Sequence, residues 1–529
     1  MKIQGSHLTP AQREAVAKFL SSVEATAQKA KAGVCTSKPH IVENDPGWDG
    51  WGFDTSNTRF EPEAVTALNA SDVPRLKLKW AFGFPGASAT FGQPTVYGGR
   101  VFAGSEDGTV YSLDANTGCI YWTYKAPSTV KTAVSIGLKG RAAFFGDVSG
   151  NVYALNSLTG ALLWQTHVDA HPAARITGSP LLWHGRLYVP VSSGEEGAAI
   201  DPKYPCCTFR GSVVALNART GKQIWKTCMI PNPAQPAGKN SAGTQLWGPS
   251  GAAVWSPPTI DPKRRVIYVA TGNSYSDPTS PYTDAVIALS LDTGKMLWAR
   301  QFTPNDRWNT ACVAPDKANC PKNPGTDYDF GSPPMLVSTP GGKKSLIAGQ
   351  KSGVVYALDP AHRGRVIWAS RIGKGGPLGG IEWGGATEGH EVFFPLSDWQ
   401  DGNPAAGGGL FALQVATGKK VWYAPPAKPD CASQFGCSAA QMAPVTAIPG
   451  VVFSGSEDGH IRAYNAQNGN LLWDFETARD FQTVNGVKAR GGSLNATGPA
   501  IVDGVLYMDA GYTNGLAGNV LLAFSVDGK

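Results

Sequence analysis

The stretch Tyr153–Trp164, "YALNSLTGALLW", combines a strand ending in Ala-Leu, a turn ending in Thr-Gly and a second strand that ends in tryptophan. In a turn of this kind an Asp or Asn side chain caps its own backbone, and the glycine adopts a positive φ. The stretch therefore predicts a tight β-hairpin that closes on Trp164.

The same pattern occurs along most of the chain. It is found in six further segments, which end at Trp122, Trp225, Trp298, Trp368, Trp422 and Trp473. Two incomplete copies remain: "RLKLKW" ends at Trp80 with no hairpin before it, and "NVLLAFSVDG" (residues 519–528) has no tryptophan after it. We expect these two segments to share one sheet, because that arrangement closes a ring and removes the exposed sheet edges.

The sequence thus predicts an all-β fold, an eight-bladed β-propeller of Trp-ended four-stranded blades. The first two spacings between the repeated tryptophans are 42 residues, and the later ones range from 51 to 73. The longer intervals must carry insertions, which in repeat proteins usually mark the working face. We expect the repeated tryptophans to pack between neighbouring blades.

Two segments precede the predicted ring. Residues 1–30 have apolar residues at helical spacing, with Thr9 as a plausible N-cap and Pro10 at the first helical position. Residues 31–75 are expected to form an arm that includes "WDGWGFDTSNTRF", and residues 76–529 to form the propeller.

Composition excludes some functional classes. The chain has 529 residues and a formal net charge of +6 without a basic run, which is not the signature of a nucleic-acid-binding protein. No apolar run reaches the length of a transmembrane helix. The N-terminus also lacks the apolar region of a signal peptide, so a targeting segment is expected to lie outside this chain.

Six of the nine cysteines lie in close pairs within loops: Cys206 and Cys207, Cys312 and Cys320, Cys431 and Cys437. Such pairs are typical of disulfides in an exported protein. Cys35, Cys119 and Cys228 remain, so at least one cysteine is left unpaired.

Several phrases resemble the quinoprotein alcohol dehydrogenases, eight-bladed propellers that hold pyrroloquinoline quinone (PQQ) and a metal ion at the ring centre. These phrases are "WDGWGFDTSNTRF", "CCTFRGSVVAL", "AVWSPPTIDP", "VATGNSYS", "DYDFGSPPML" and "AGQKSGVVYALDP". The resemblance covers residues 45–529 and is strongest to the branch that oxidises polyvinyl alcohol. The helix over residues 1–30 resembles the end of a cytochrome c domain found in some members. The chain has no C-x-x-C-H motif, so it cannot attach a c-type haem.

The resemblance implies a set of cofactor and metal contacts. "ITGSP" and "VSSGEEG" match the segments in which the family has a cofactor-binding Thr, a cofactor-binding Ser and a metal-binding Glu. The matched residues are Thr177 and Ser192 for the cofactor, Glu195 for the metal with Glu196 as the alternative ligand, Trp255 as the floor under the quinone, Asn273 for the metal, and Lys351 beside the quinone oxygens.

The catalytic base falls in an insertion, where two residues remain open. Matching "YDF" to the Trp-Asp-aromatic pattern of the family selects Asp329. In some members an Asp two residues after the base marks a lanthanide site, which would make Asp327 the base and Asp329 a metal ligand. Glu382 and Trp383 lie in the Gly-dense loop "GGIEWGGATEG", which suits close approach by a ligand.

The adjacent cysteines depart from the methanol-oxidising branch, in which a vicinal disulfide covers the quinone but lies earlier in the chain. Cys206 and Cys207 belong instead to an insertion just after the Glu pair. A bridge between them would be flat and apolar, and we expect it to form a lid opposite Trp255. A staple within the insertion, or two free thiols, is the alternative.

These residue types suit alcohol oxidation. An indole gives a planar quinone a flat floor, and carboxylate and amide oxygens bind a hard cation that polarises a carbonyl. An Asp can take the hydroxyl proton, and an ammonium can stabilise charge on the quinone oxygens. The cofactors implied by the resemblance are PQQ and Ca²⁺, with a lanthanide as the alternative.

The leading hypothesis is a periplasmic PQQ enzyme that oxidises secondary alcohol groups, those of polyvinyl alcohol above all, to ketones and passes electrons to cytochrome c. A non-catalytic propeller scaffold of the outer-membrane assembly type is one alternative. A PQQ dehydrogenase for small alcohols is the other.

Overall fold

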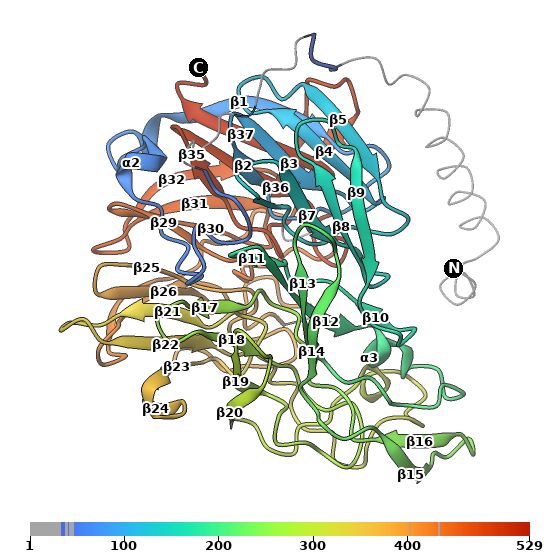
Figure 1. The fold of residues 1–529 in the computed structure, drawn as a ribbon. Helices are drawn as coiled ribbons and strands as arrows, with labels where there is room; N and C mark the ends of the chain where they lie inside the picture. The colour runs from blue at the N-terminus through green and yellow to red at the C-terminus, as the bar shows by residue number, and fades with distance from the viewer. Residues whose placement is uncertain (1–32, 37–40, 42–46, 401, 432–433) are drawn as a thin grey trace.

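The computed structural model describes residues 33–36, 41, 47–400, 402–431 and 434–529. The helix predicted over residues 1–30 lies outside the described residues. Eight antiparallel blades follow one another around a ring (Figure 1), which confirms the predicted eight-bladed propeller. Seven are four-stranded sheets, and the third carries the short strand β10 (Ala174–Arg175) in addition to its four strands. The first strand of the ring begins at Leu76.

The strands of the first four blades are, from the axis outward, β2 (Thr95–Tyr97), β3 (Arg100–Gly104), β4 (Thr109–Asp114) and β5 (Ile120–Lys125); β6 (Ser135–Gly137), β7 (Ala142–Gly146), β8 (Asn151–Asn156) and β9 (Leu162–His167); β11 (Leu181–Trp183), β12 (Arg186–Ser193), β13 (Ser212–Asn217) and β14 (Gln223–Cys228); and β17 (Thr259–Asp261), β18 (Val266–Ala270), β19 (Ala285–Ser290) and β20 (Met296–Gln301).

The strands of the last four blades are, in the same order, β21 (Met335–Ser338), β22 (Lys344–Gly349), β23 (Val354–Asp359) and β24 (Arg365–Arg371); β25 (Ala386–Glu388), β26 (Glu391–Pro395), β27 (Leu410–Gln414) and β28 (Lys420–Ala424); β29 (Thr446–Ile448), β30 (Val451–Gly455), β31 (His460–Asn465) and β32 (Leu471–Glu476); and β35 (Ala500–Val502), β36 (Val505–Ala510), β37 (Val520–Val526) and β1 (Leu76–Gly83).

Short elements lie in the connecting segments. They are the strands β10 (Ala174–Arg175), β15 (Gln235–Lys239), β16 (Gln245–Gly248), β33 (Asp480–Phe481) and β34 (Ala489–Arg490), the helices α2 (Glu63–Thr66) and α3 (Glu195–Ala198), and the 3₁₀ turns η2 (Val73–Arg75), η3 (Thr310–Cys312) and η4 (Pro360–His362). The described part of the chain contains no helix with the length and hydropathy needed to cross a membrane.

The ring closes by pairing the two incomplete repeats. β1 pairs antiparallel with β37, from Leu76 opposite Val526 to Gly83 opposite Val520. In Figure 1 the blue strand β1 accordingly lies beside the red strand β37. The eighth blade therefore joins residues from both ends of the described chain, as the sequence predicted.

The repeated tryptophans pack against glycines of the next blade. The indole of Trp122 donates a hydrogen bond to the carbonyl oxygen of Ser157 at 2.8 Å. A Cβ on Gly160, which has a φ of +75°, would lie 2.8 Å from that ring. The turn therefore requires glycine both for its backbone conformation and for the close approach of the indole. Six other tryptophans have the same relation to a glycine: Trp80, Trp164, Trp225, Trp298, Trp368 and Trp422.

An arm formed by residues 48–61 winds around the inside of the ring. In six blades, the second residue of the innermost strand donates its backbone N–H to a carbonyl oxygen of the arm. The pairs are Val96 with Trp48, Ile136 with Asp49, Ile260 with Thr55, Leu336 with Ser56, Thr387 with Thr58, and Ala447 with Arg59, at 2.8–3.0 Å. The arm thus ties the innermost strands of six blades to one segment.

The arm makes no such bond to the third blade. Residues 50–54 pass β11 without pairing, and a cavity of about 280 Å³ lies there, lined by residues that include Trp51, Leu182 and Trp183. Arg59, which is fully buried, ties the arm to the opposite side of the ring. Its guanidinium donates to the carbonyl oxygens of Val445 at 2.8 Å and Pro499 at 3.3 Å.

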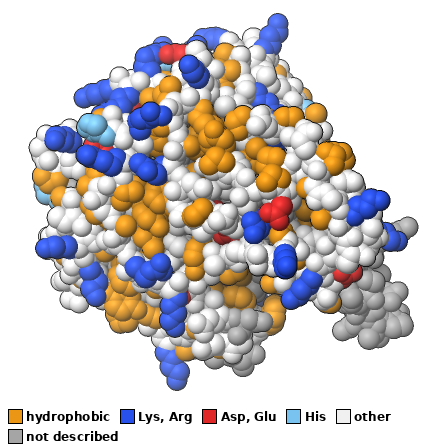
Figure 2. Space-filling view, turned by 90° about the horizontal axis from the view of Figure 1, so that it is seen from below, with side chains coloured by type: hydrophobic (Ala, Val, Ile, Leu, Met, Phe, Trp, Pro, Cys, Tyr) orange, Lys and Arg blue, Asp and Glu red, His pale blue; other side chains and the backbone are white. Residues whose placement is uncertain are grey.

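The predicted cysteine pairs are confirmed as disulfides, and a fourth bridge joins Cys35 to Cys119. Cys228 is the cysteine left without a bridge. Figure 2 shows Lys and Arg side chains spread over one face of the molecule with few Asp and Glu among them, in keeping with the net charge of +6.

Candidate active site

All the predicted site residues lie at one end of the ring, because of the blade topology. In an antiparallel four-stranded blade, the loop between the second and third strands and the loop leading to the next blade emerge at the same end. Glu195, Asn273 and Lys351 lie in loops of the first kind, and Trp255 and Asp329 in loops of the second kind. Residues far apart in the sequence therefore converge.

A cavity of about 300 Å³ lies among these loops, a volume within the range of small-molecule sites. Seven of the predicted residues line it: Thr177, Ser192, Glu196, Trp255, Asp329, Lys351 and Trp383. The other six lie behind the lining: Glu195, Cys206, Cys207, Asn273, Asp327 and Glu382, each with at most 5% of its surface exposed. The disulfide thus lies behind the cavity wall and not on its surface.

Lys351 lies between the two candidate bases. Its Nζ is 3.2 Å from Oδ2 of Asp327 and 3.8 Å from Oδ2 of Asp329. Burial alone would lower the pKa of Lys351, but the carboxylates of Asp327 and Asp329 together raise it well above its usual value. Burial raises the pKa of Asp327 to about 7, although the ammonium opposes this shift. Lys351 is therefore a cation at neutral pH.

Asp329 has one oxygen engaged and one oxygen at the lysine. Its Oδ1 accepts a hydrogen bond from the backbone N–H of Asn273 at 2.8 Å. The backbone N–H of Lys351 also donates to the carbonyl oxygen of Asp329 at 3.0 Å. These bonds fix the carboxylate at the cavity wall with Oδ2 on the side of Lys351.

Trp255 presents a flat surface bounded by other site residues. The ring of Trp383 stands edge-on to it, with centroids 5.2 Å apart and planes at 90°. Lys351 Nζ lies 5.5 Å from the centroid of the Trp255 ring. Gly331 packs so closely on the indole that a Cβ there would lie 2.2 Å from a ring carbon. The indole is therefore held firmly and is available to stack on a planar ligand.

Trp383 is held, through Asn495, by the buried carboxyl of Glu457. Its indole N–H donates to Asn495 Oδ1 at 3.0 Å, and Asn495 in turn contacts the carboxyl of Glu457. Burial raises the pKa of Glu457 and of Glu382 to about 8. Both carboxyls are therefore protonated at neutral pH, which limits the negative charge behind the cavity.

Oxygen atoms suited to a hard cation also meet here. Asn273 is fully buried, and its Oδ1 has no hydrogen-bond partner among the described residues. Glu196 lines the cavity, and burial together with the charges of Asp327 and Asp329 raises its pKa well above the usual value. A cation would give the Asn273 oxygen a partner and would favour the ionised form of Glu196, so these residues fit a metal ion. No group of three His, Cys, Asp or Glu side chains in the described ranges could hold a metal unaided, so a cation here also needs Asn273 and ligand oxygens.

Glu195 occupies a different environment from Glu196. Its Oε1 accepts from the Tyr204 hydroxyl at 3.0 Å and from the backbone N–H of Thr208 at 2.8 Å. Its Oε2 accepts from the backbone N–H of Phe209 at 2.8 Å. The structure therefore directs Glu195 toward the segment around the disulfide, and Glu196 toward the cavity.

Sequence reasoning missed two cations of the lining, Lys131 and Arg175, and four aromatic residues, Trp51, Phe91, Tyr275 and Tyr512. Burial lowers the pKa of Lys131, whose Nζ lies 3.9 Å from the centroid of the Phe91 ring. Phe91, Lys131 and Arg175 lie just before inner strands, as Trp255 does, and that shared position was the available signal. Three cations, these two and Lys351, thus surround a cavity suited to an anionic planar ligand.

Comparison with known proteins identifies the family of the chain. Residues 173–370 match the family described as the β-propeller domain of glucose, ethanol and alcohol dehydrogenases that use PQQ. Residues 55–203 match the family of the outer membrane protein assembly factor BamB.

Two relatives are named polyvinylalcohol dehydrogenase. That of a Pseudomonas species is 42% identical, covering 91% of this chain and 77% of the relative. That of Sphingopyxis sp. (strain 113P3) is 41% identical, covering 96% of this chain and 81% of the relative. The chain belongs to the PQQ-dependent quinoprotein alcohol dehydrogenase family. It is an oxidoreductase of this type.

Solved structures share the fold. The quinohemoprotein alcohol dehydrogenase of Comamonas testosteroni superposes with a TM-score of 0.67 at 20% identity, over 96% of this chain and 85% of that one. BamB of Moraxella catarrhalis superposes with a TM-score of 0.53 at 17% identity, over 85% of this chain and 99% of that one. A europium-containing methanol dehydrogenase superposes with a TM-score of 0.66 at 18% identity, over 91% of this chain and 99% of that one. At these identities the likeness concerns the fold alone.

Proposed function

We propose that this chain oxidises secondary alcohol groups to ketones and that polyvinyl alcohol is its substrate. The proposal depends above all on one observation: Asp329 and Lys351 meet beside Trp255 in a single cavity. The polymer is supported by the names of the two relatives at 41% and 42% identity. Transfer of electrons to cytochrome c and a periplasmic location complete the proposal, the latter supported by the four disulfides.

Asp329 serves as the general base in this scheme. Its Oδ1 is engaged by the N–H of Asn273, so Oδ2 is the atom that takes the hydroxyl proton. The ammonium of Lys351, 3.8 Å from Oδ2, interacts favourably with the ionised carboxylate. Asp327 lies behind the lining and supports Lys351 through their contact at 3.2 Å.

Trp255 forms the floor for the quinone, and Thr177 and Ser192 line the wall beside it. Their hydroxyls are hydrogen-bonded to each other at 2.7 Å. Lys131 and Arg175 would pair with the cofactor carboxylates. Glu196 and Asn273 Oδ1 would hold Ca²⁺, with a lanthanide as the alternative. When bound, PQQ supplies the electrophilic carbonyl that accepts the hydride, which no side chain can do.

The test is dye reduction by purified protein with polyvinyl alcohol, with and without added PQQ and Ca²⁺. We expect activity to need both. Asp329→Ala should lose turnover by about 10²–10⁴-fold, the usual contribution of a general base, while still quenching tryptophan fluorescence on PQQ binding. Asp327→Ala is the matched variant and should lose less.

Three results would contradict this scheme. Full turnover without added or copurified PQQ would exclude the cofactor. Unchanged turnover of Asp329→Ala with loss in Asp327→Ala would assign the base to Asp327. A higher kcat/KM for butan-2-ol than for the polymer would favour the alternative, a dehydrogenase for small alcohols.

A further inference from the structure

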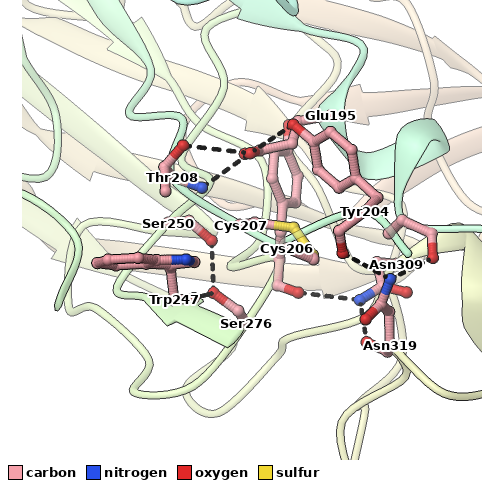
Figure 3. The surroundings of a disulfide bond; sticks show 12 residues. Glu195, Tyr204, Cys206, Cys207, Thr208, Trp247, Ser250, Ser276, Asn309 and Asn319 are labelled. Carbon is pink, nitrogen blue, oxygen red and sulfur yellow. Dashed lines mark hydrogen bonds between the residues drawn. A yellow bond between two sulfur atoms is a disulfide. The ribbon is translucent and has the colours of Figure 1, made fainter. Parts of the chain in front are cut away.

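The two adjacent glutamates at the start of α3 face different surroundings, and the partners of Glu195 define a role for it. Glu195 has no exposed surface, and its two oxygens accept three hydrogen bonds of 3.0 Å or less. The donors belong to Tyr204, Thr208 and Phe209, which flank Cys206 and Cys207 on both sides. Figure 3 shows the Glu195 carboxylate directed at this segment, with the disulfide beside it.

The other side of the disulfide is held by the β15–β16 hairpin. The backbone N–H of Cys207 donates to the carbonyl oxygen of Trp247 at 3.1 Å, and the N–H of Trp247 donates to that of Cys206 at 2.8 Å. The Ser276 hydroxyl also donates to the Trp247 carbonyl oxygen at 2.6 Å. The Cys206–Cys207 ring is therefore fixed between one buried carboxylate and one strand.

A third support comes from the loop that carries Asp327 and Asp329. Asn319, next to the disulfide-bonded Cys320, is almost fully buried. Its side-chain N–H groups reach carbonyl oxygens of the segment that precedes Cys206. They donate to Ala199 at 3.0 Å, Asp201 at 2.8 Å and Tyr204 at 3.2 Å. The loop that carries the candidate base and the loop that carries the Cys206–Cys207 disulfide are thus joined.

The Cys206–Cys207 disulfide in turn packs in the hydrophobic core behind the wall of the cavity. Cys206 and Cys207 are at most 1% exposed and pack in one hydrophobic cluster with Ala253 and Tyr275. Ala253 and Tyr275 both line the cavity, close in the sequence to Trp255 and Asn273 respectively. The Cys206–Cys207 disulfide and these two lining residues therefore belong to one continuous hydrophobic core.

We propose that the adjacent carboxylates divide two tasks: Glu196 faces the metal ion, and Glu195 is a positioning residue that holds the Cys206–Cys207 ring against the cavity wall. The assignment of Glu196 rests on the proposed function. The assignment of Glu195 does not, because it follows from hydrogen bonds that Glu195 makes with other residues of this chain.

The experiment compares Glu195→Gln with Glu196→Gln by two measurements. The first is Ca²⁺ affinity by calorimetry in the presence of PQQ. The second is the rate at which dithiothreitol exposes Cys206 and Cys207 to iodoacetamide, followed by peptide mass, with Cys431 and Cys437 as the internal control. Both substitutions nearly preserve side-chain size, and circular dichroism confirms folding.

We expect opposite responses. In Glu195→Gln, labelling of the ring should become at least about tenfold faster, because losing a charge-assisted hydrogen bond raises local opening by that factor or more. Its Ca²⁺ Kd should stay within about threefold. In Glu196→Gln, the Ca²⁺ Kd should rise by on the order of a hundredfold, with ring labelling unchanged.

Loss of Ca²⁺ binding in Glu195→Gln with unchanged ring labelling would overturn the inference. So would retained Ca²⁺ affinity in Glu196→Gln. If the unsubstituted protein bound neither PQQ nor Ca²⁺, the proposed function would fail, and the labelling rates would still decide the role of Glu195.

Discussion

Glu61, at the end of the arm, makes stability depend on pH in a direction opposite to that of most carboxyls. Its side chain is fully buried, and neither oxygen has a hydrogen-bond partner in the part of the chain that the structure describes. Burial, with a smaller contribution from Asp503, raises the pKa of Glu61 from 4.5 to about 9. The folded protein therefore keeps this proton to a much higher pH than the unfolded chain.

The magnitude follows from linkage. Between about pH 4.5 and 9 the folded state binds one proton more than the unfolded state, so the free energy of unfolding falls by about 1.4 kcal/mol per pH unit because of Glu61. The contribution is fully present below the unfolded pKa and is lost as pH rises through the folded pKa. From about pH 5.5 to 8.5 the loss amounts to about 4 kcal/mol.

Glu61→Gln removes this dependence. We expect urea unfolding, followed by tryptophan fluorescence, to give similar stabilities for variant and parent at about pH 5.5 and a variant more stable by about 4 kcal/mol at about pH 8.5. Glu63→Gln is the control, because Glu63 is two residues away and exposed, and its slope should match the parent. An unchanged slope in Glu61→Gln, or a variant less stable at every pH, would refute the reasoning.

Two further predictions concern the cofactor and the fold. Trp255→Leu should weaken PQQ binding by about 30-fold, since it removes the stacking surface, and equilibrium dialysis of PQQ would measure this; an unchanged Kd would contradict the assigned floor. Replacing both Cys35 and Cys119 by Ser opens a bridge with a sequence separation of 84 residues. By chain entropy, loss of the bridge should lower the free energy of unfolding by about 4.5 kcal/mol, and equal denaturation midpoints for variant and parent would disprove this.

The fold could be predicted because its determinants are local and repeated. Each hairpin carries its own turn glycine and its own tryptophan, and the packing of Trp122 on Gly160 recurs from blade to blade. Ring closure was also predictable, since Trp80 and residues 519–528 each lack what the other supplies. The course of the arm was not, because its partners are backbone groups of six blades and leave no pattern in the side chains.

The candidate site was predictable by residue type but not in every role. The family match selected Glu195 as the metal ligand with Glu196 as the alternative, and what separates the two in the structure is the pair of N–H groups at Thr208 and Phe209 that engage Glu195. Lys131 and Arg175 escaped notice because a single basic residue in a loop carries no motif of its own, and only their position just before inner strands, which they share with Trp255, distinguishes them. Their contribution exists only once neighbouring blades bring them to the same cavity.

The arm also has a consequence for the order of assembly. Its carbonyl oxygens find their partners on six different blades, so they can all be satisfied only after those blades stand side by side. Each blade can form from strands that are neighbours in the chain, whereas the arm can pair only after the six blades have assembled into the propeller. Docking of the arm is therefore a late, cooperative step of folding. Proteolytic cleavage between residues 48 and 61 would detect molecules in which the propeller has not yet closed.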